Sequence, residues 1–109
     1  MSAMSINKEQ AISYINALVN KFFKILPMKE HGDESLGAYM QSFQIELMGC
    51  RSALPGIGDN ASFVTLIGLL QYLIEHPHCD VKIVRREVFH AIDLCGRLKE
   101  AINGGGDGS

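Results

Sequence analysis

The sequence is poor in several residue types, and each shortage argues against a class of protein. It has no tryptophan, 7% aromatic residues and only three cysteines in 109 residues. The cysteines (Cys50, Cys79 and Cys95) are odd in number and widely spaced, so they do not form the framework of a small disulfide-stapled protein. Ten Lys and Arg against twelve Asp and Glu give a net charge of −2, which argues against a domain that is basic throughout and binds nucleic acid.

Long apolar runs are also missing. The most hydrophobic stretch, residues 63–74, is interrupted by Thr65, Gly68 and Gln71 and falls short of the roughly 20 apolar residues of a membrane span. The first residues have neither the basic nor the apolar region of a signal peptide. We therefore expect a cytoplasmic protein with free thiols and no membrane contact.

The sequence does contain strong helical periodicity. Apolar residues recur at three- and four-residue steps in four segments, which predict helices at about 6–26, 35–54, 60–76 and 81–102. Four helices with short connections predict an all-α fold, in which residues 1–103 form a single antiparallel four-helix bundle. The Gly-rich residues 104–109 are predicted to be a flexible tail.

Local signals suggest where these helices begin and end. Ser5 or Asn7 can cap the first helix, and Asn7 with Gln10 has the spacing of a capping box. Pro27 is predicted to end that helix, because proline lacks the N–H that a helix interior needs. Residues 54–60, rich in proline and glycine, are predicted to be a loop.

The turn between the third and fourth segments contains a possible metal site. His76, His78 and Cys79 carry imidazole and thiolate groups, the preferred ligands of zinc. No second ligand pair has a recognised spacing, and the alternative is a helix end followed by a proline turn. We find no nucleophile elbow, phosphate loop or Glu-x-x-His pair, so we expect no enzyme, no catalytic residue and no cofactor.

The last predicted helix differs in charge from the rest of the chain. Residues 81–100 hold five basic and three acidic residues, a charge of +2, whereas residues 1–80 hold five basic and eight acidic residues, a charge of −3. Lys82, Arg85 and Arg86 lie in its first turns, as in the recognition helix of a helix-turn-helix. DNA binding is therefore one hypothesis, and an acidic protein surface is an equally good target for the arginines.

The apolar content exceeds what one lone bundle needs. Large residues lie beside the main apolar stripe of each segment: Phe23, Ile45, Leu69, Tyr72, Ile83, Phe89 and Ile92. If some stay exposed, they mark an interaction surface, and a symmetric homodimer is the commonest way to cover one. The alternative is that single surface hydrophobes are ordinary.

The leading hypothesis is a small non-enzymatic protein–protein interaction module. Such a chain would be an adaptor, an inhibitor or immunity protein, or a chaperone-like protein, of the kind found in bacteria and phages. It would act as a homodimer through the segments 60–76 and 81–102, and we expect these partner-binding residues: Tyr72, Lys82, Arg85, Arg86 and Phe89. The alternatives are the small DNA-binding regulator and a zinc- or thiol-dependent protein centred on the His76–Cys79 turn.

Overall fold

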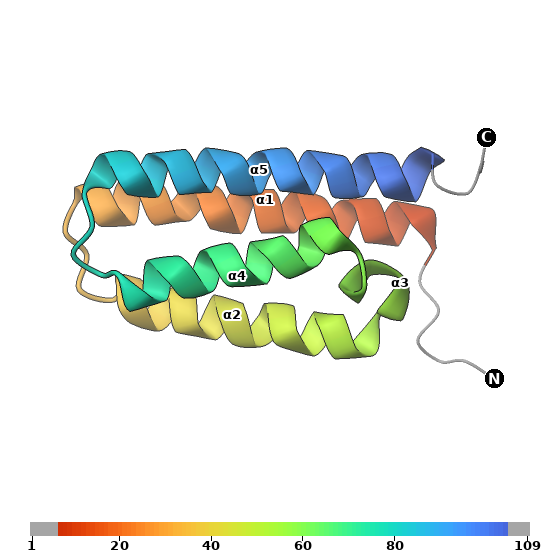
Figure 1. Ribbon diagram of the computed structural model, residues 1–109, viewed down its shortest axis with the longest axis horizontal. Helices are drawn as coiled ribbons and strands as arrows, with labels where there is room; N and C mark the ends of the chain where they lie inside the picture. The colour runs from red at the N-terminus through yellow and green to blue at the C-terminus, as the bar shows by residue number, and fades with distance from the viewer. Residues whose placement is uncertain (1–6, 105–109) are drawn as a thin grey trace.

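The computed structural model describes residues 7–104, and within this range the chain forms five α-helices and no strand (Figure 1). They are α1 (Lys8–Glu30), α2 (Leu36–Ala53), α3 (Pro55–Gly58), α4 (Ala61–Glu75) and α5 (Val81–Gly104). The predicted all-α class is confirmed. The predicted Ser5 cap, the helix start at residue 6 and the tail beyond Gly104 lie outside the described residues. Gly104 itself, assigned to that tail, is the last residue of α5.

The long helices lie side by side, so the molecule is elongated, with extents of 45 × 28 × 19 Å (Figure 1). The N-terminal helix α1 packs along the C-terminal helix α5, and α4 packs against both α2 and α5. Successive long helices run in opposite directions. The α1–α5 pairing is the most extensive in the molecule, which places an early and a late part of the chain on the same outer surface.

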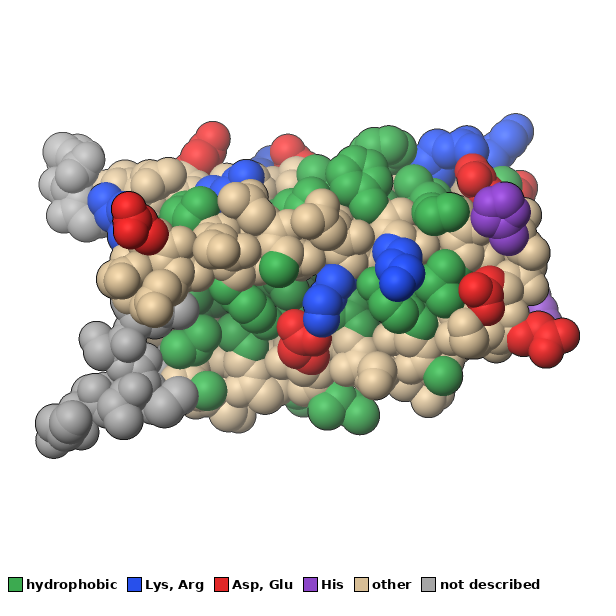
Figure 2. Space-filling model, turned by 180° about the vertical axis from the view of Figure 1, so that it is seen from behind, with side chains coloured by type: hydrophobic (Ala, Val, Ile, Leu, Met, Phe, Trp, Pro, Cys, Tyr) green, Lys and Arg blue, Asp and Glu red, His purple; other side chains and the backbone are tan. Residues whose placement is uncertain are grey.

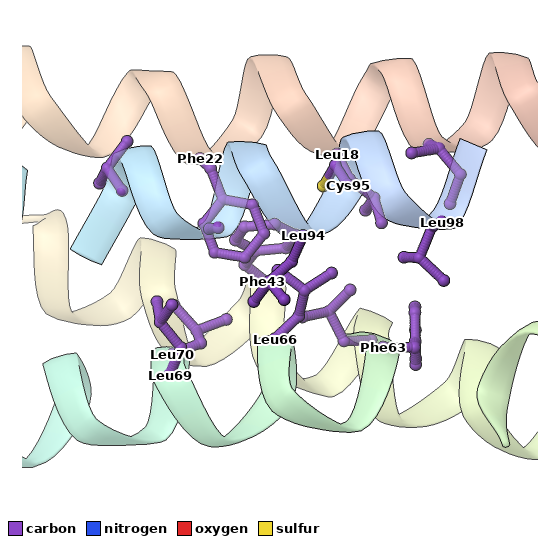
Figure 3. Packing of buried hydrophobic residues seen from close by; sticks show 14 of the residues in the cluster. Leu18, Phe22, Phe43, Phe63, Leu66, Leu69, Leu70, Leu94, Cys95 and Leu98 are labelled. Carbon is purple, nitrogen blue, oxygen red and sulfur yellow. The ribbon is translucent and has the colours of Figure 1, made fainter. Parts of the chain in front are cut away.

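A continuous hydrophobic core lies between the helices (Figure 3). Phe22, Leu18, Leu66, Leu70 and Cys95 are fully buried, and Phe22 meets Phe43 of α2 edge to face with ring centroids 4.7 Å apart. Every helix contributes to this core, and the described residues include no buried polar or charged side chain. Each buried aliphatic or aromatic side chain stabilises the fold by about 1.5–3 kcal/mol relative to exposure.

The predicted capping box is present at the start of α1. The Asn7 side chain accepts a hydrogen bond from the Gln10 backbone N–H at 2.7 Å, and the Asn7 N–H donates to the Gln10 side chain at 3.2 Å. These two bonds satisfy backbone donors that the helix itself leaves free.

The prediction that Pro27 ends the first helix is wrong, since α1 continues to Glu30. Proline removes only one backbone donor, and the exposed Pro27 ring lies on the solvent side of the last turn. The Pro27 carbonyl still accepts from the His31 N–H at 2.9 Å, and the Met28 carbonyl accepts from the Asp33 N–H at 2.9 Å. The Lys29 side chain, beyond the proline, also donates to the Pro77 carbonyl at 2.9 Å and ties this turn to the connection between α4 and α5.

The prediction of a loop over residues 54–60 is also wrong, because α3 forms one helical turn there. The Gly58 N–H donates to the Leu54 carbonyl at 2.7 Å, and Ile57 is buried in the core. A Cβ atom at Gly58 would lie 2.4 Å from the Arg51 carbonyl oxygen, so only glycine permits this close return to α2.

Among the described helices, none combines the length and apolar composition that a membrane span requires.

Candidate protein-binding surface

The residues expected to bind a partner lie mainly on the exposed side of α5. The Asp80 side chain accepts from the Lys82 N–H at 3.2 Å and so caps the first turn of this helix. Val84 and Val88 are buried, which turns Arg85, Arg86 and Phe89 toward solvent by helical periodicity.

Phe89 is the aromatic centre of this surface and is 51% exposed. It meets Phe23 of α1, itself 42% exposed, edge to face with ring centroids 6.0 Å apart and an interplanar angle of 87°. Figure 2 shows hydrophobic side chains gathered beside Lys and Arg side chains along the edge where α5 lies. We call the surface formed by Phe23, Arg85, Arg86, Phe89 and Lys82 the α5 patch.

The basic side chains of the α5 patch are partly engaged with carboxylates. Arg85 Nη2 lies 3.3 Å from Glu30 Oε2, and Arg86 Nη2 lies 3.1 Å from Glu87 Oε2. Among the described residues, Lys82 forms no ion pair. The Arg85–Glu30 pair is about half exposed and contributes little to stability. In the second pair Glu87 is mostly buried, but Arg86 is 68% exposed, so both guanidinium groups stay accessible.

Tyr72 makes a different aromatic contact from that of Phe89. Tyr72 lies on α4, is 37% exposed and stacks on His76 with ring centroids 4.2 Å apart. His76 Nδ1 in turn lies 2.8 Å from the Tyr72 carbonyl oxygen, so these two rings form a local unit at the end of α4. On α1, Phe23 contacts Phe89 and Glu30 pairs with Arg85.

Sequence reasoning did not include Phe23 and Glu30 among the site residues. Phe23 was visible as a large apolar residue beside the main stripe of its helix, but nothing local indicated that it meets Phe89. Glu30 lies in a turn predicted to be outside the first helix, and its pairing with Arg85 depends on the packing of α1 against α5.

The geometry of α4 and α5 differs from that of a helix-turn-helix. These helices run side by side in opposite directions (Figure 1), whereas the two helices of that motif cross steeply, at roughly 90–120°. The carboxylates of Glu30 and Glu87 beside the two arginines further weaken attraction to phosphate.

The suggested metal ligands are not gathered by the fold. No group of three or more His, Cys, Asp or Glu side chains placed to hold a metal ion occurs within residues 7–104. His76 is held against Tyr72, while Cys79 is partly buried against the core. His78 instead borders an open hollow of about 390 Å³ at the end of the molecule, together with Met28, Leu36 and Ile74.

The buried thiol of Cys95 and the partly buried thiol of Cys50 are held in their protonated form. Burial raises the pKa of Cys95 to about 11 and raises the pKa of Cys50 above its ordinary value. Burial, with Cys50 beside it, also raises the pKa of the Tyr14 hydroxyl. A thiol needs its anionic form to act as a nucleophile, so Cys50 and Cys95 are poorly reactive at neutral pH.

No protein family, curated protein or solved structure matches the chain.

Proposed function

We propose that the chain is a non-enzymatic protein–protein interaction module that binds its partner through the α5 patch. The observation that carries the proposal is the Phe23–Phe89 pair, in which two large aromatic side chains stay 42% and 51% exposed. Exposed aromatic residues next to arginine are the usual anchors of protein interfaces.

The arrangement of the helices supports this proposal. We infer that α1, α2, α4 and α5 act as one antiparallel four-helix bundle, with α3 as a connection. A bundle of this kind presents rigid helix faces, which bind partners without first having to become ordered. Free thiols at all three cysteines favour a reducing compartment, and we propose the cytoplasm.

Affinity capture from the organism of origin tests this function. The baits are the unaltered chain, Phe89→Ala, and Ile45→Ala as a matched control, because Ile45 is 73% exposed on α2, outside the α5 patch. We expect the unaltered chain and Ile45→Ala to retain the same binding protein, and Phe89→Ala to lose it. Equal capture by all three baits would show that Phe89 is not an anchor.

A duplex DNA titration at two salt concentrations separates this proposal from a DNA-binding regulator. Binding by phosphate contacts is strongest at low salt and falls steeply as salt is added. We expect no binding of mixed-sequence duplex even at low salt. Salt-sensitive binding that is lost on Arg86→Glu would favour the DNA-binding function instead.

A further inference from the structure

We propose that the partner of the α5 patch is a second copy of the chain, with the two α5 helices packed antiparallel and Phe89 of each copy at the centre. This inference rests on the proposed function, because it names the partner of the same surface. Three observations support it: the order of charges along α5, the uncharged surface beside it, and the weak ion pairs that hold its charged residues in the single chain.

The order of charges on the Phe89 side of α5 is self-complementary. Lys82 and Arg85 precede Phe89, whereas Asp93 and Glu100 follow it, and all five side chains are exposed. Their spacings of three, four, four and seven residues place them on one face of the helix. Arg86 also precedes Phe89, and Arg97, which follows it, is paired with Asp93. Reversing the direction of the helix therefore brings the basic half of one copy against the half of the other copy that holds Asp93 and Glu100.

The register follows from the position of Phe89. Arg85 and Asp93 each lie four residues from Phe89, so an antiparallel copy centred there places Arg85 opposite the partner copy's Asp93, twice by symmetry. Lys82 and Gly96 each lie seven residues away. A Cβ at Gly96 would have nothing within 4 Å, which leaves space for the aliphatic part of the lysine.

The surface of α1 beside α5 can come close to another chain without burying charge. Residues 10–20 include no Asp, Glu, Lys or Arg. Asn16 of this stretch accepts a hydrogen bond from Lys99 of α5 at 2.9 Å, so the uncharged stretch adjoins the α5 face. Interface cores are depleted in charged residues in the same way.

The charged residues of the proposed interface are held only weakly in the single chain. Arg85 pairs with Glu30 at 3.3 Å with both side chains 48% exposed, and Asp93 pairs with Arg97 at 3.3 Å with both more than 60% exposed. Exposed ion pairs of this kind contribute little to stability. Replacing them with ion pairs to a second copy therefore costs little free energy.

Sedimentation equilibrium on the full chain tests the dimer. We expect a dimer at about 100 μM that dissociates on dilution, and Phe89→Ala should raise the dissociation constant at least about 30-fold, the effect of losing a central anchor. Ile45→Ala, a control elsewhere on the surface, should leave it unchanged. A chain that is monomeric at about 100 μM overturns the inference.

Charge exchange tests the register. Arg85→Glu alone and Asp93→Arg alone should each weaken the dimer about 10-fold, because each sets like charges against each other at two symmetry-related places. The double variant R85E/D93R should return the dissociation constant to within about 3-fold of the original. Eight residues of helix separate the two positions by about 12 Å, so rescue must come from contact between two chains.

The results also separate this inference from the proposed function. A monomeric chain whose capture of another protein depends on Phe89 overturns the dimer but retains the interaction module. A monomeric chain with no Phe89-dependent capture overturns both. A dimer that is insensitive to Phe89→Ala, or that R85E/D93R does not restore, overturns the antiparallel α5 interface. Circular dichroism of each variant confirms that the helices are intact.

Discussion

Phe23 of α1 and Phe89 of α5 meet edge to face on the outer surface of the molecule, with ring centroids 6.0 Å apart. Both side chains remain about half exposed, so this contact between the first and last helices lies outside the core. It therefore adds to the packing of α1 on α5 and also forms the most aromatic part of the α5 patch.

A double-mutant cycle measures how much this pair contributes to folding. We expect Phe23→Ala and Phe89→Ala each to lower the free energy of unfolding by about 1 kcal/mol, since half-exposed side chains lose only part of their burial. The coupling between them should be about 0.5 kcal/mol, the lower end for an edge-to-face pair. Urea unfolding of the four proteins at a concentration that keeps them monomeric gives the values, and additive losses would exclude a direct interaction.

Gly58 and Gly56 form a matched pair within α3. A Cβ at Gly58 would lie 2.4–2.8 Å from Arg51 backbone atoms, whereas one at Gly56 would have nothing within 4 Å. We expect Gly58→Ala to lower the free energy of unfolding by about 1–3 kcal/mol through overpacking. Gly56→Ala should be neutral or stabilise by up to about 1 kcal/mol. Thermal unfolding compares the two, and equal effects would show that the contact with Arg51 is unimportant.

Pro27 is predicted to make α1 less stable than the same helix with alanine at position 27. Alanine restores the N–H that can donate to the Phe23 carbonyl, four residues earlier, and removes the clash of the proline ring with that carbonyl. Pro27→Ala should therefore raise the free energy of unfolding by about 1–3 kcal/mol. Asn20→Ala, an exposed change within the same helix, should raise it by only about 0.5 kcal/mol. A loss of stability in Pro27→Ala would mean that proline stabilises the turn.

The three thiols should differ in reactivity, because Cys95 is buried whereas Cys50 and Cys79 are partly exposed. Cys95 is fully buried and its pKa is raised to about 11, so iodoacetamide at pH 8.5 should label it last. Cys79, partly exposed, should be labelled first, and Cys50, whose pKa burial also raises, should follow. Peptide mapping by mass spectrometry gives the rates. Labelling in denaturant should remove the differences, and early labelling of Cys95 in the native chain would contradict its burial.

The same thiol predicts how stability depends on pH in alkaline solution. The Cys95 pKa is about 11 in the folded chain and 9.0 in its ordinary state, so the folded chain keeps the proton more tightly. The contribution of the protonated Cys95 thiol to the free energy of unfolding is therefore complete below pH 9 and is lost as the pH rises toward about 11. Cys95→Ser should alter this alkaline loss, which urea unfolding at pH 8, 9 and 10 measures. An unchanged pH dependence would show that another group is responsible.

Much of the fold is encoded in local sequence patterns. The capping box at Asn7 depends on a residue three positions away, and the apolar periodicity of Ile15, Leu18 and Phe22 depends only on helical spacing. These features were predictable because the interacting groups are neighbours in the chain. Lys82, Arg85, Arg86 and Phe89 were likewise placed on one helix by their spacing alone.

Sequence by itself thus determined the all-α class, the approximate extent of the long helices and the exposed basic start of α5. Tertiary structure alone decided that α1 continues past Pro27, that α3 forms at Pro55, and that Phe23 and Glu30 contact Phe89 and Arg85. The physical reason is that contacts with distant parts of the chain, the burial of Ile57 and the hydrogen bond of Lys29 to the Pro77 carbonyl, outweigh the local preference of proline and glycine to end helices. The α5 patch needs α1 and α5 side by side, and only packing across the whole chain creates that contact.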